Sequence, residues 1–327
     1  MGQDRQDDLR VRGFERRIWS IVAHSPLESL WNLKGIPMRV VAIRTWESIN
    51  SDRIFGHAAE LAFYFLFALF PTLFCAGSAF GMVARSAHHD YDQMLNYLSF
   101  VIPGQALAAV LNTFNATAAA ATSSKVTFGT IATLWSASVG ISAIQDTMNA
   151  VYKINDRRSY IVARMHAIGL TILLSGILTL GLASMLGGDL GAAAAFTDVR
   201  NHALAGVLAV GVRVAAWTIA TSLLALAFAV IYYWAPDLRK RRWHWFTPGG
   251  AVGISGWLIA SVGFRIYLHF FNNFSYVYGS LGAVIILLTW FYISGLMLLV
   301  GAEINSEIEA AAAKQRYEAM ARPHNQD

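Results

Sequence analysis

The stretch "VYGSLGAVIILLTWFYISGLMLLVGAEI", residues 277–304, decides the fold class of this chain. Its residues are almost all apolar, and no charged side chain occurs between Tyr278 and Glu303. A helix needs about 20 mostly apolar residues to cross the roughly 30 Å of hydrocarbon in a bilayer. The stretch therefore predicts a helix that spans a membrane.

The composition of the whole chain indicates the same solvent. The 327 residues are 56% hydrophobic and only 14% charged, and the mean hydropathy is +0.45. About a quarter of the residues in a soluble domain are charged, so this chain has too few polar side chains to cover a water-soluble core. The single cysteine, Cys75, cannot form an internal disulfide. We therefore expect most of the chain to lie in lipid.

Five further segments are long and apolar enough to span a bilayer, which predicts an all-α polytopic membrane protein with six transmembrane helices. The predicted spans cover about residues 56–84, 127–151, 165–187, 203–234, a fifth segment that begins at Thr247, and 277–304. Thr247 is a suitable N-cap for the fifth helix, and Pro248 is a suitable first helical residue. The transmembrane domain then covers residues 53–305.

Lysine and arginine alternate between rich and poor loops along the predicted spans. Twenty of the 25 lie in four places, and the other three loops hold three. The rich segments are the N-terminal segment 1–52 with the adjoining Arg53, the loops 153–164 and 239–242, and the C-terminal tail 306–327. Cytoplasmic loops carry such an excess of positive residues, so we expect both termini in the cytoplasm.

The N-terminal segment 1–52 contains a helical pattern. The first long apolar run begins near residue 55, which is too far from the start for a signal peptide. Apolar residues near one helical face predict an amphipathic helix on the membrane surface, although a solvated helix fits the pattern equally well. These residues are Ile36, Val40, Ile43 and Ile49.

The loop at about residues 85–126 is the long loop on the outer side. Apolar residues recur at helical spacing on both sides of Pro103 and Gly104. Proline followed by glycine interrupts a helix. We therefore expect a broken helical hairpin at the outer face.

The stretch "LRKRRWHWF", residues 238–246, combines basic and aromatic side chains and could be taken for a nucleic-acid-binding surface. The positive-inside pattern makes it a short cytoplasmic loop instead. Its basic residues are expected to meet anionic lipid headgroups, and its tryptophans to lie in the interfacial aromatic belt. The predicted anchors are Arg239, Lys240, Arg241, Arg242, Trp243 and Trp245. No nucleic-acid partner is expected, because no RNA-binding signature accompanies them.

Four segments of the chain together resemble the YihY/BrkB family of bacterial inner-membrane proteins. They are "AAELAFYFLFALFPTLF" (58–74), "LWSASVGISAIQDTMNAVYKI" (134–154), "APDLRKRRWHWFTPGGAVGISGWLIASVGFRIYL" (235–268) and "YGSLGAVIILLTWFYISGLMLLVGAEINSEI" (278–308). The resemblance implies six spans and a bacterial inner membrane. Members have been called virulence factors for serum resistance and, under an older label, a tRNA-processing ribonuclease, and transport has been suggested for relatives. The family supplies no agreed catalytic residues.

The ribonuclease label finds no support in the residues. A metal-dependent nuclease needs histidines and carboxylates that converge on one or two ions. The nearest pattern is "HHDYD", residues 88–92, on the predicted outer loop, and a solvated turn explains it better. No phosphate-binding glycine loop, nucleophile elbow or zinc helix occurs. We therefore expect no enzyme, no metal and no cofactor.

Polar residues inside the predicted spans are the strongest functional signal. A charge near the centre of a bilayer costs about 3 kcal/mol even on a lenient scale, so such residues should face protein or water. The predicted substrate pathway consists of Glu60, Asp146, Asn149, Arg213, Arg265, His269 and Tyr278. Contacts that merely hold helices together explain these polar residues equally well.

The depths of these residues suggest what the pathway would carry. Arg265 lies about 25 Å beyond Pro248, whereas Glu60 and Asp146 lie about 8 Å from the cytoplasmic ends of their helices. A cationic outer half and an acidic inner mouth would suit transport or flipping of a small or lipidic anionic substrate. A non-catalytic scaffold or envelope-integrity factor is the alternative, and the arginines could instead reach the outer headgroups. Membrane lipids are the expected partners, and the sequence does not decide whether the chain forms a homo-oligomer.

Overall fold

The structure is a computed structural model of the whole chain. It describes residues 37–83, 123–154, 158–198, 201–239, 243–270 and 281–321, together with a few isolated positions. In these ranges the structure has seven helices and no strand. The predicted all-α class is therefore confirmed for the described part of the chain.

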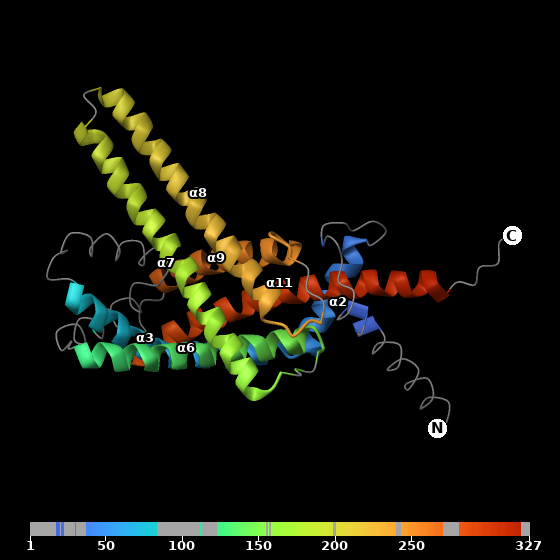
Figure 1. Cartoon of the computed structure of the whole chain (residues 1–327). Coiled ribbons are helices and arrows are strands. Elements are labelled where there is room, and N and C mark those ends of the chain that lie inside the picture. The colour runs from blue at the N-terminus through green and yellow to red at the C-terminus, as the bar shows by residue number, and fades with distance from the viewer. Residues whose placement is uncertain are drawn as a thin grey trace.

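Four helices lie side by side and form the body of the molecule (Figure 1). They are α3 (Ile54–Val83), α6 (Ser123–Val151), α9 (Pro248–Phe270) and α11 (Leu281–Ala321). Helix α11 is the longest, with 41 residues, and it contacts α3, α6 and α9. The main apolar core lies where α11 meets α3 and α6, around Leu61, Met148 and Leu299.

Helices α7 (Tyr160–Asp198) and α8 (His202–Trp234) form a long hairpin that projects from this body (Figure 1). Asn201 is the N-cap of α8, because its side chain accepts hydrogen bonds from the backbone N–H groups of Ala203 and Leu204. The two helices approach closely through small residues, since a Cβ on Gly188 would overlap the side chain of Ala216.

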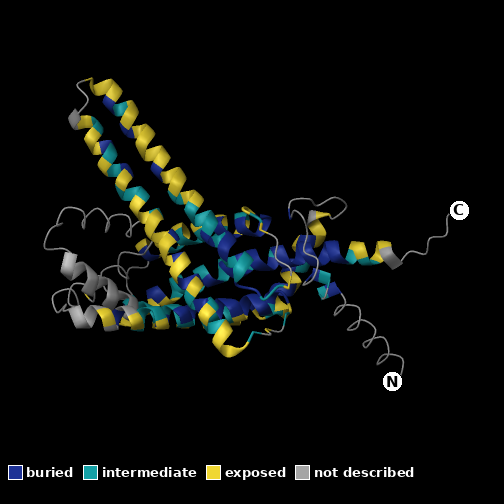
Figure 2. Cartoon of the chain, viewed as in Figure 1, coloured by how far each residue is buried: buried dark blue, intermediate teal, exposed yellow. Residues whose placement is uncertain are grey.

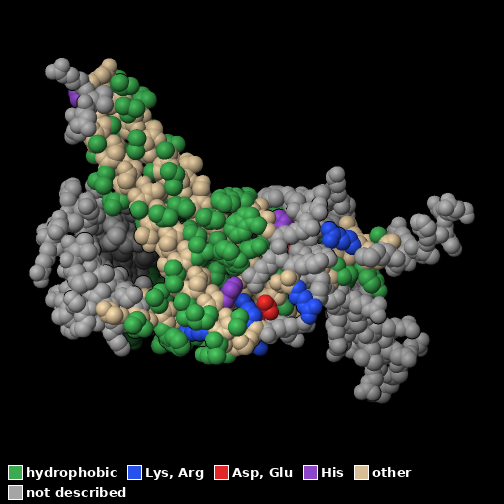
Figure 3. All heavy atoms as spheres, viewed as in Figure 1, with side chains coloured by type: hydrophobic (Ala, Val, Ile, Leu, Met, Phe, Trp, Pro, Cys, Tyr) green, Lys and Arg blue, Asp and Glu red, His purple; other side chains and the backbone are tan. Residues whose placement is uncertain are grey.

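The outer part of this hairpin exposes apolar side chains on most of its surface. Figure 2 shows it largely exposed, and Figure 3 shows hydrophobic side chains along the visible face. Val207 and Ile219, for example, are 70% and 51% exposed. An apolar surface of this extent is stable against lipid and unstable against water.

Four of the described helices are long and apolar enough to cross a membrane, namely Tyr160–Phe196, His202–Trp234, Pro248–Phe270 and Leu281–Ala319. They coincide with the last four of the six predicted spans. The other two predicted spans fall on α3 and α6. In the described part of α3 the apolar stretch is the shorter Ile54–Leu69, and α6 is diluted by hydroxyl and amide side chains.

The predicted N-terminal helix is present as α2 (Met38–Ser51), but it packs on α11. Its buried face includes Val41, Thr45 and Ser48. Of the residues expected on the apolar face, Ile49 is buried as predicted, whereas Val40 and Ile43 are 38% and 47% exposed. Packing against α11, which is far away in the sequence, therefore determines which face of α2 is buried.

Helix α11 continues without a break beyond residue 304, where the predicted sixth span ends, to Ala321. The residues from Asn305 to Ala313 are buried, so this part of the chain belongs to the packed structure. The predicted outer hairpin of residues 85–126 lies almost entirely outside the described residues, and its last residues form the start of α6.

Helices α9 and α11 cross at a pair of glycines. A Cβ on Gly249 would overlap the carbonyl oxygen of Gly301, and a Cβ on Gly301 would overlap the carbonyl oxygen of Gly249. Gly253 and Gly256 continue the contact along α9, against Met297. These glycines allow one backbone to approach another.

Candidate functional site

Among the described residues, a large group of polar side chains lies where several helices end against the middle of α11. We call this group the polar junction. It consists of Ser48 and Asp52 from α2 and its C-cap, Tyr152 and Lys153 after α6, Tyr232 on α8, Thr247 before α9, and Glu303, Asn305, Glu307 and Glu309 on α11. Because α2, α6, α8 and α9 all have an end here, the loops that join them lie at the same end of the molecule.

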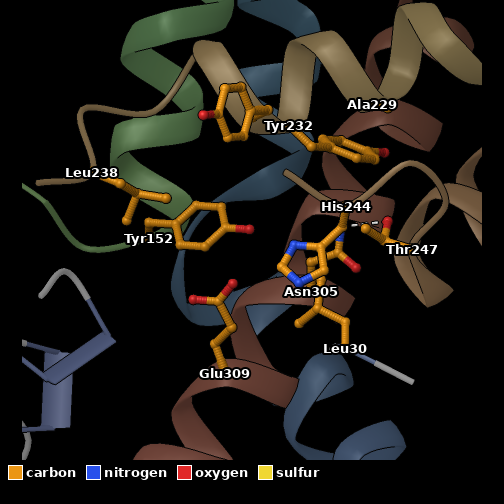
Figure 4. A pocket seen from close by; sticks show the side chains of 10 residues that line it. Leu30, Tyr152, Ala229, Tyr232, Leu238, His244, Thr247, Asn305 and Glu309 are labelled. Atoms are coloured by element: carbon orange, nitrogen blue, oxygen red, sulfur yellow. Dashed lines mark hydrogen bonds between the residues drawn. The ribbon is translucent and has the colours of Figure 1, made fainter. Parts of the chain in front are cut away.

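A small cavity opens inside the polar junction (Figure 4). It encloses about 30 Å³, which is about the volume of one water molecule. Glu309, Tyr152 and His244 turn their polar groups toward the same space, and Asn305 and Thr247 lie beside them. The cavity can therefore hold a water molecule or a small cation, but not an organic substrate.

Asn305 joins α11 to the start of α9 through two hydrogen bonds. Its Oδ1 accepts the backbone N–H of Gly249 at 3.0 Å, and its Nδ2 donates to Thr247 Oγ1 at 3.0 Å. Thr247 Oγ1 also accepts the N–H of Gly250 at 2.9 Å, which makes it the N-cap that the sequence predicted. On α8, Tyr232 donates its hydroxyl to the carbonyl of Leu298 at 3.0 Å.

Three glutamates of α11 are buried in this junction. Glu303 is 0% exposed, and Glu307 and Glu309 are each 6% exposed. Ser48 donates its hydroxyl to Glu307 Oε1 at 2.8 Å. Within the described residues, both carboxylate oxygens of Glu303 and Oε2 of Glu309 have no hydrogen-bond partner. Buried carboxylates in such a setting are costly as anions.

Two helices end at this junction on residues with unusual backbone angles. Arg53, between α2 and α3, has φ 54°, and Lys153, after α6, has φ 53°. Residues other than glycine rarely adopt this region, and each such residue costs about 1–3 kcal/mol. Lys153 is held by Asp52 at 3.3 Å and lies 5.1 Å from the ring centroid of Trp19.

A network of ion pairs fastens the loop after α6 to the loop after α8. Asn149 donates to Asp156 Oδ2 at 3.1 Å and accepts the backbone N–H of Asp237 at 2.7 Å. Arg158 binds Asp156 from its Nε at 3.0 Å and reaches Asp237 at 3.8 Å. The hydrogen bond from Arg158 lowers the pKa of Asp156 below its ordinary value.

A second, larger hollow runs along α8 and has a volume of about 630 Å³, which is in the range of small-molecule sites. Arg213 lines it, followed along the helix by Trp217 and the hydroxyl groups of Thr218, Thr221 and Ser222. Trp245 and Phe246, from the loop before α9, also line it. We call this hollow the α8 groove. Arg213 donates from Nε to Asp189 of α7 at 3.0 Å.

The predicted pathway residues that the structure describes do not line one common cavity. Glu60 lies on α3 with its side chain 47% exposed and 3.3 Å from His57. Asp146 is exposed on α6, within electrostatic reach of Glu60 and Asp156. Asn149, in contrast, is buried in the loop network described above. These three therefore lie toward the polar junction.

The remaining predicted pathway residues lie elsewhere. Arg213 lines the α8 groove. Arg265 and His269 are exposed near the far end of α9, and the His269 ring contacts Phe270. Tyr278 lies outside the described residues.

The predicted interface anchors are arranged as a cluster of rings. Trp243 packs against Tyr233 at 5.1 Å and against Trp245 at 6.2 Å between ring centroids. Trp243 and Trp245 are 41% and 57% exposed, while His244 between them faces the small cavity. Arg239 is exposed, and residues 240–242 lie outside the described part of the chain.

Sequence reasoning missed the residues that carry most of the polar contacts. Arg158 was counted only among the basic residues of the loop 153–164, and Glu307 and Glu309 fell in the predicted C-terminal tail 306–327. Asp156 and Asp237 were assigned no role. The signal that could have shown the tail to be buried was the run of alanines at residues 310–313, which allows close packing. Within the described residues, no group of three or more His, Cys, Asp and Glu is arranged to hold a metal ion.

Comparison with known proteins shows the family. The family model described as "Virulence factor BrkB" matches residues 45–325. A protein of Bacillus subtilis (strain 168) with "ribonuclease-like protein YfkH" in its name is 33% identical over 250 residues, which are 76% of this chain and 88% of that protein.

Two further relatives are each named "UPF0761 membrane protein". The one from Xanthomonas oryzae pv. oryzae (strain PXO99A) is 27% identical over 85% of this chain and 62% of its own length. The one from Stenotrophomonas maltophilia (strain R551-3) is 26% identical over 81% of this chain and 60% of its own length. No solved structure matches the chain. Since the family model covers most of the chain and the described helices include four that could cross a membrane, this chain belongs to the BrkB virulence factor family of membrane proteins.

Proposed function

We propose that the protein transports or flips a small or lipidic anionic substrate, and that the α8 groove is where the substrate binds. The observation that carries this proposal is one arginine in a hollow of about 630 Å³ that is otherwise apolar or hydroxyl-bearing. The helix that forms it is apolar enough to cross a membrane. A guanidinium in such surroundings is a strong anion-binding group.

The chemistry of the groove matches an anionic amphiphile. Arg213 has five N–H donors, and the ion pair to Asp189 uses the one on Nε. Trp217, Trp245 and Phe246 provide an apolar surface next to it. A phosphate or carboxylate could compete with Asp189 for Arg213, while an acyl chain lies along the rings. Since the side chain of Arg213 is 56% exposed, a substrate can reach it from the outer surface of the α7–α8 hairpin.

The proposed setting is a bacterial inner membrane with six spans and both termini in the cytoplasm. The distribution of lysine and arginine supports it, because twenty of 25 fall in the four segments assigned to the cytoplasm. The polar junction also supports it. Helices α2, α6, α8 and α9 meet there, and three of the four segments rich in lysine and arginine adjoin that end of the molecule. Anionic lipid headgroups would be the partners of Arg239 and its neighbours.

We also propose that the protein is not an enzyme and binds no nucleic acid. The relative in Bacillus subtilis has a ribonuclease-like name, but an RNA strand could not reach the carboxylates that this chain gathers. Glu303, Glu307 and Glu309 are at most 6% exposed. A nuclease needs its carboxylates and metal ions open to the phosphate.

A scaffold without transport is the rival that a specific observation favours. Asn149, predicted to line a pathway, is buried and holds two loops together. Polar groups with this role stabilise helix contacts in lipid. If all polar residues acted in this way, their replacement would lower the abundance of the protein and would affect no transport activity.

Purified protein in liposomes separates the two functions. We would measure scrambling of a fluorescent anionic phospholipid and uptake of organic anions, with wild type, Arg213→Gln and Asp189→Asn. Arg213→Gln should keep normal abundance and lose flux. Asp189→Asn removes the ion pair but keeps the arginine, so its flux should persist. Equal loss of abundance in both variants, or flux equal to that of empty vesicles for wild type, would contradict transport.

A further inference from the structure

Glu303 is the most completely buried acidic group in the described part of the chain, and it is the starting point of this inference. Its residue is 0% exposed and lies in α11, about 33 Å from the first residue of that helix at 1.5 Å per residue. A bilayer core is about 30 Å thick. Glu303 therefore lies where a membrane helix leaves the hydrocarbon, within reach of the loops at the polar junction.

The surroundings of Glu303 disfavour a negative charge more than they stabilise it, because burial and the neighbouring Asp52 and Glu307 outweigh Lys153 and Ser48. Neither carboxylate oxygen has a hydrogen-bond partner in the described residues. The nearby Ser48 donates its one hydroxyl proton to Glu307 instead, at 2.8 Å. An ionised carboxylate without donors is several kcal/mol less stable when buried, and binding of one proton removes most of that cost.

The charged groups that face Glu303 come from three elements. Asp52 at the end of α2 and Glu307 on α11 repel a negative charge on Glu303, whereas Lys153 after α6 attracts it. Tyr152, next to Lys153, also lies within its field. Lys153 is paired with Asp52 at 3.3 Å. Lys153, the cation that acts on Glu303 within the described residues, is thus already paired with a competing carboxylate.

We propose that Glu303 is a proton-binding site and that its proton couples substrate movement to a pH gradient. In the proton-bound state Glu303 is neutral and Lys153 stays with Asp52, as observed. Loss of the proton to water leaves a carboxylate that competes with Asp52 for Lys153. The coupling half of this proposal rests on the proposed transport function, whereas proton binding does not.

The position of Glu303 allows its charge to act on the helix contacts. Gly301, two residues before it, is the point where α11 crosses α9, and Asn305, two residues after it, binds Gly249 of α9. Lys153 ends α6 in a left-handed backbone conformation, with φ 53°. A shift of Lys153 toward Glu303 would change both the end of α6 and the α2 contact, so one proton can bias several helices.

Infrared difference spectroscopy of the full-length protein in liposomes tests the proton site directly. Protonated carboxyl groups absorb infrared light at a different frequency from carboxylates. At about pH 7 ordinary glutamates are ionised. The wild type should show a protonated-carboxyl band that weakens in Glu303→Gln. Glu318→Gln is the matched control, because Glu318 is exposed and near Lys314, and it should leave the band unchanged. A band of equal size in Glu303→Gln would overturn the site.

Two further measurements complete the test. Glu303→Asp keeps a carboxyl group, so if Glu303→Gln does not fold, Glu303→Asp should show the band at a shifted frequency, and an unshifted band would overturn the site. Flux is then compared with and without a pH gradient, and Glu303→Gln should lose the response to the gradient. An unchanged response would overturn coupling. If no vesicle shows flux while the band behaves as expected, the transport proposal fails and the proton site stands.

Discussion

At the scale of single residues, Asn149 shows how a polar group in a helix can serve structure. The sequence placed it on a polar face with Asp146, and that face suggested a pathway. In the structure its amide donates to Asp156 and accepts the backbone N–H of Asp237. The same residue type in the same place fits both functions, and only the positions of two distant loops distinguish them.

Asp156 provides a test of this loop network. The hydrogen bond from Arg158 holds its pKa below the ordinary value of 3.8. A group with a lowered folded pKa stabilises the fold at pH values above the ordinary pKa, and this stabilisation is lost as the pH falls through the folded pKa. Asp156→Asn should therefore lower the stability by about 1 kcal/mol at neutral pH, and the gap to wild type should close at pH below about 4.

The measurement is thermal unfolding in detergent at a series of pH values. Glu318→Gln is the control, because the exposed i,i+4 contact of Glu318 with Lys314 spans 3.9 Å and contributes at most a few tenths of a kcal/mol. If Asp156→Asn matched wild type at neutral pH, or if the gap grew on acidification, the charge of Asp156 would not support the loops.

At the scale of elements, the crossing of α9 and α11 depends on Gly249 and Gly301. Gly249→Ala should strongly destabilise the protein, because the added Cβ meets a backbone carbonyl that cannot rotate away. Overpacking of this kind costs about 1–3 kcal/mol or more. Gly263→Ala on the same helix is the matched control, since nothing lies within 4 Å of the new Cβ.

Gly263→Ala should be neutral or stabilising, by up to about 1 kcal/mol, because alanine favours a helix over glycine. Both variants would be compared by yield after purification and by the midpoint of thermal unfolding in the same detergent. Equal midpoints for Gly249→Ala and Gly263→Ala would show that the α9–α11 contact relaxes more easily than the glycine pair indicates.

The elements also show what the sequence could and could not predict. Thr247 and Pro248 predicted the start of α9 correctly, because a cap and a first-turn proline act within one turn of the helix. The buried face of α2 was not predictable in this way. Val41, Thr45 and Ser48 are buried because α11 lies against them, and an isolated helical pattern does not name its partner.

The polar junction was out of reach for the same physical reason. Glu303 was recognised as a charge at the end of a span, but its lack of donors depends on where Ser48 and Lys153 lie, more than a hundred residues away. The length of α11 was also missed, since the hydrophobic period fades after residue 304 while alanines and glutamates continue the helix. Composition predicted the solvent and the helices, whereas the site required tertiary contacts.

At the scale of the whole molecule, the projecting α7–α8 hairpin gives the structure two parts with different surfaces. Helices α3, α6, α9 and α11 share a packed core, while the outer hairpin exposes apolar residues on most sides (Figure 2). The end of α7 and the start of α8 lie far from the polar junction (Figure 1). A bilayer that covers the hairpin therefore separates its turn from the loops that follow α6 and α8.

This arrangement predicts which loops are accessible from each side of the membrane. Starting from Cys75→Ala, which removes the one native cysteine, we would place single cysteines at Ser159, His202 and Glu318, all exposed. A membrane-impermeant maleimide on intact spheroplasts should label His202→Cys only, because its helix starts at the hairpin turn. Ser159→Cys and Glu318→Cys should require permeabilised cells, since both flank segments rich in lysine and arginine. Labelling of Ser159→Cys and His202→Cys from the same side would mean that α7 does not cross the bilayer, and the α8 groove would then not face lipid.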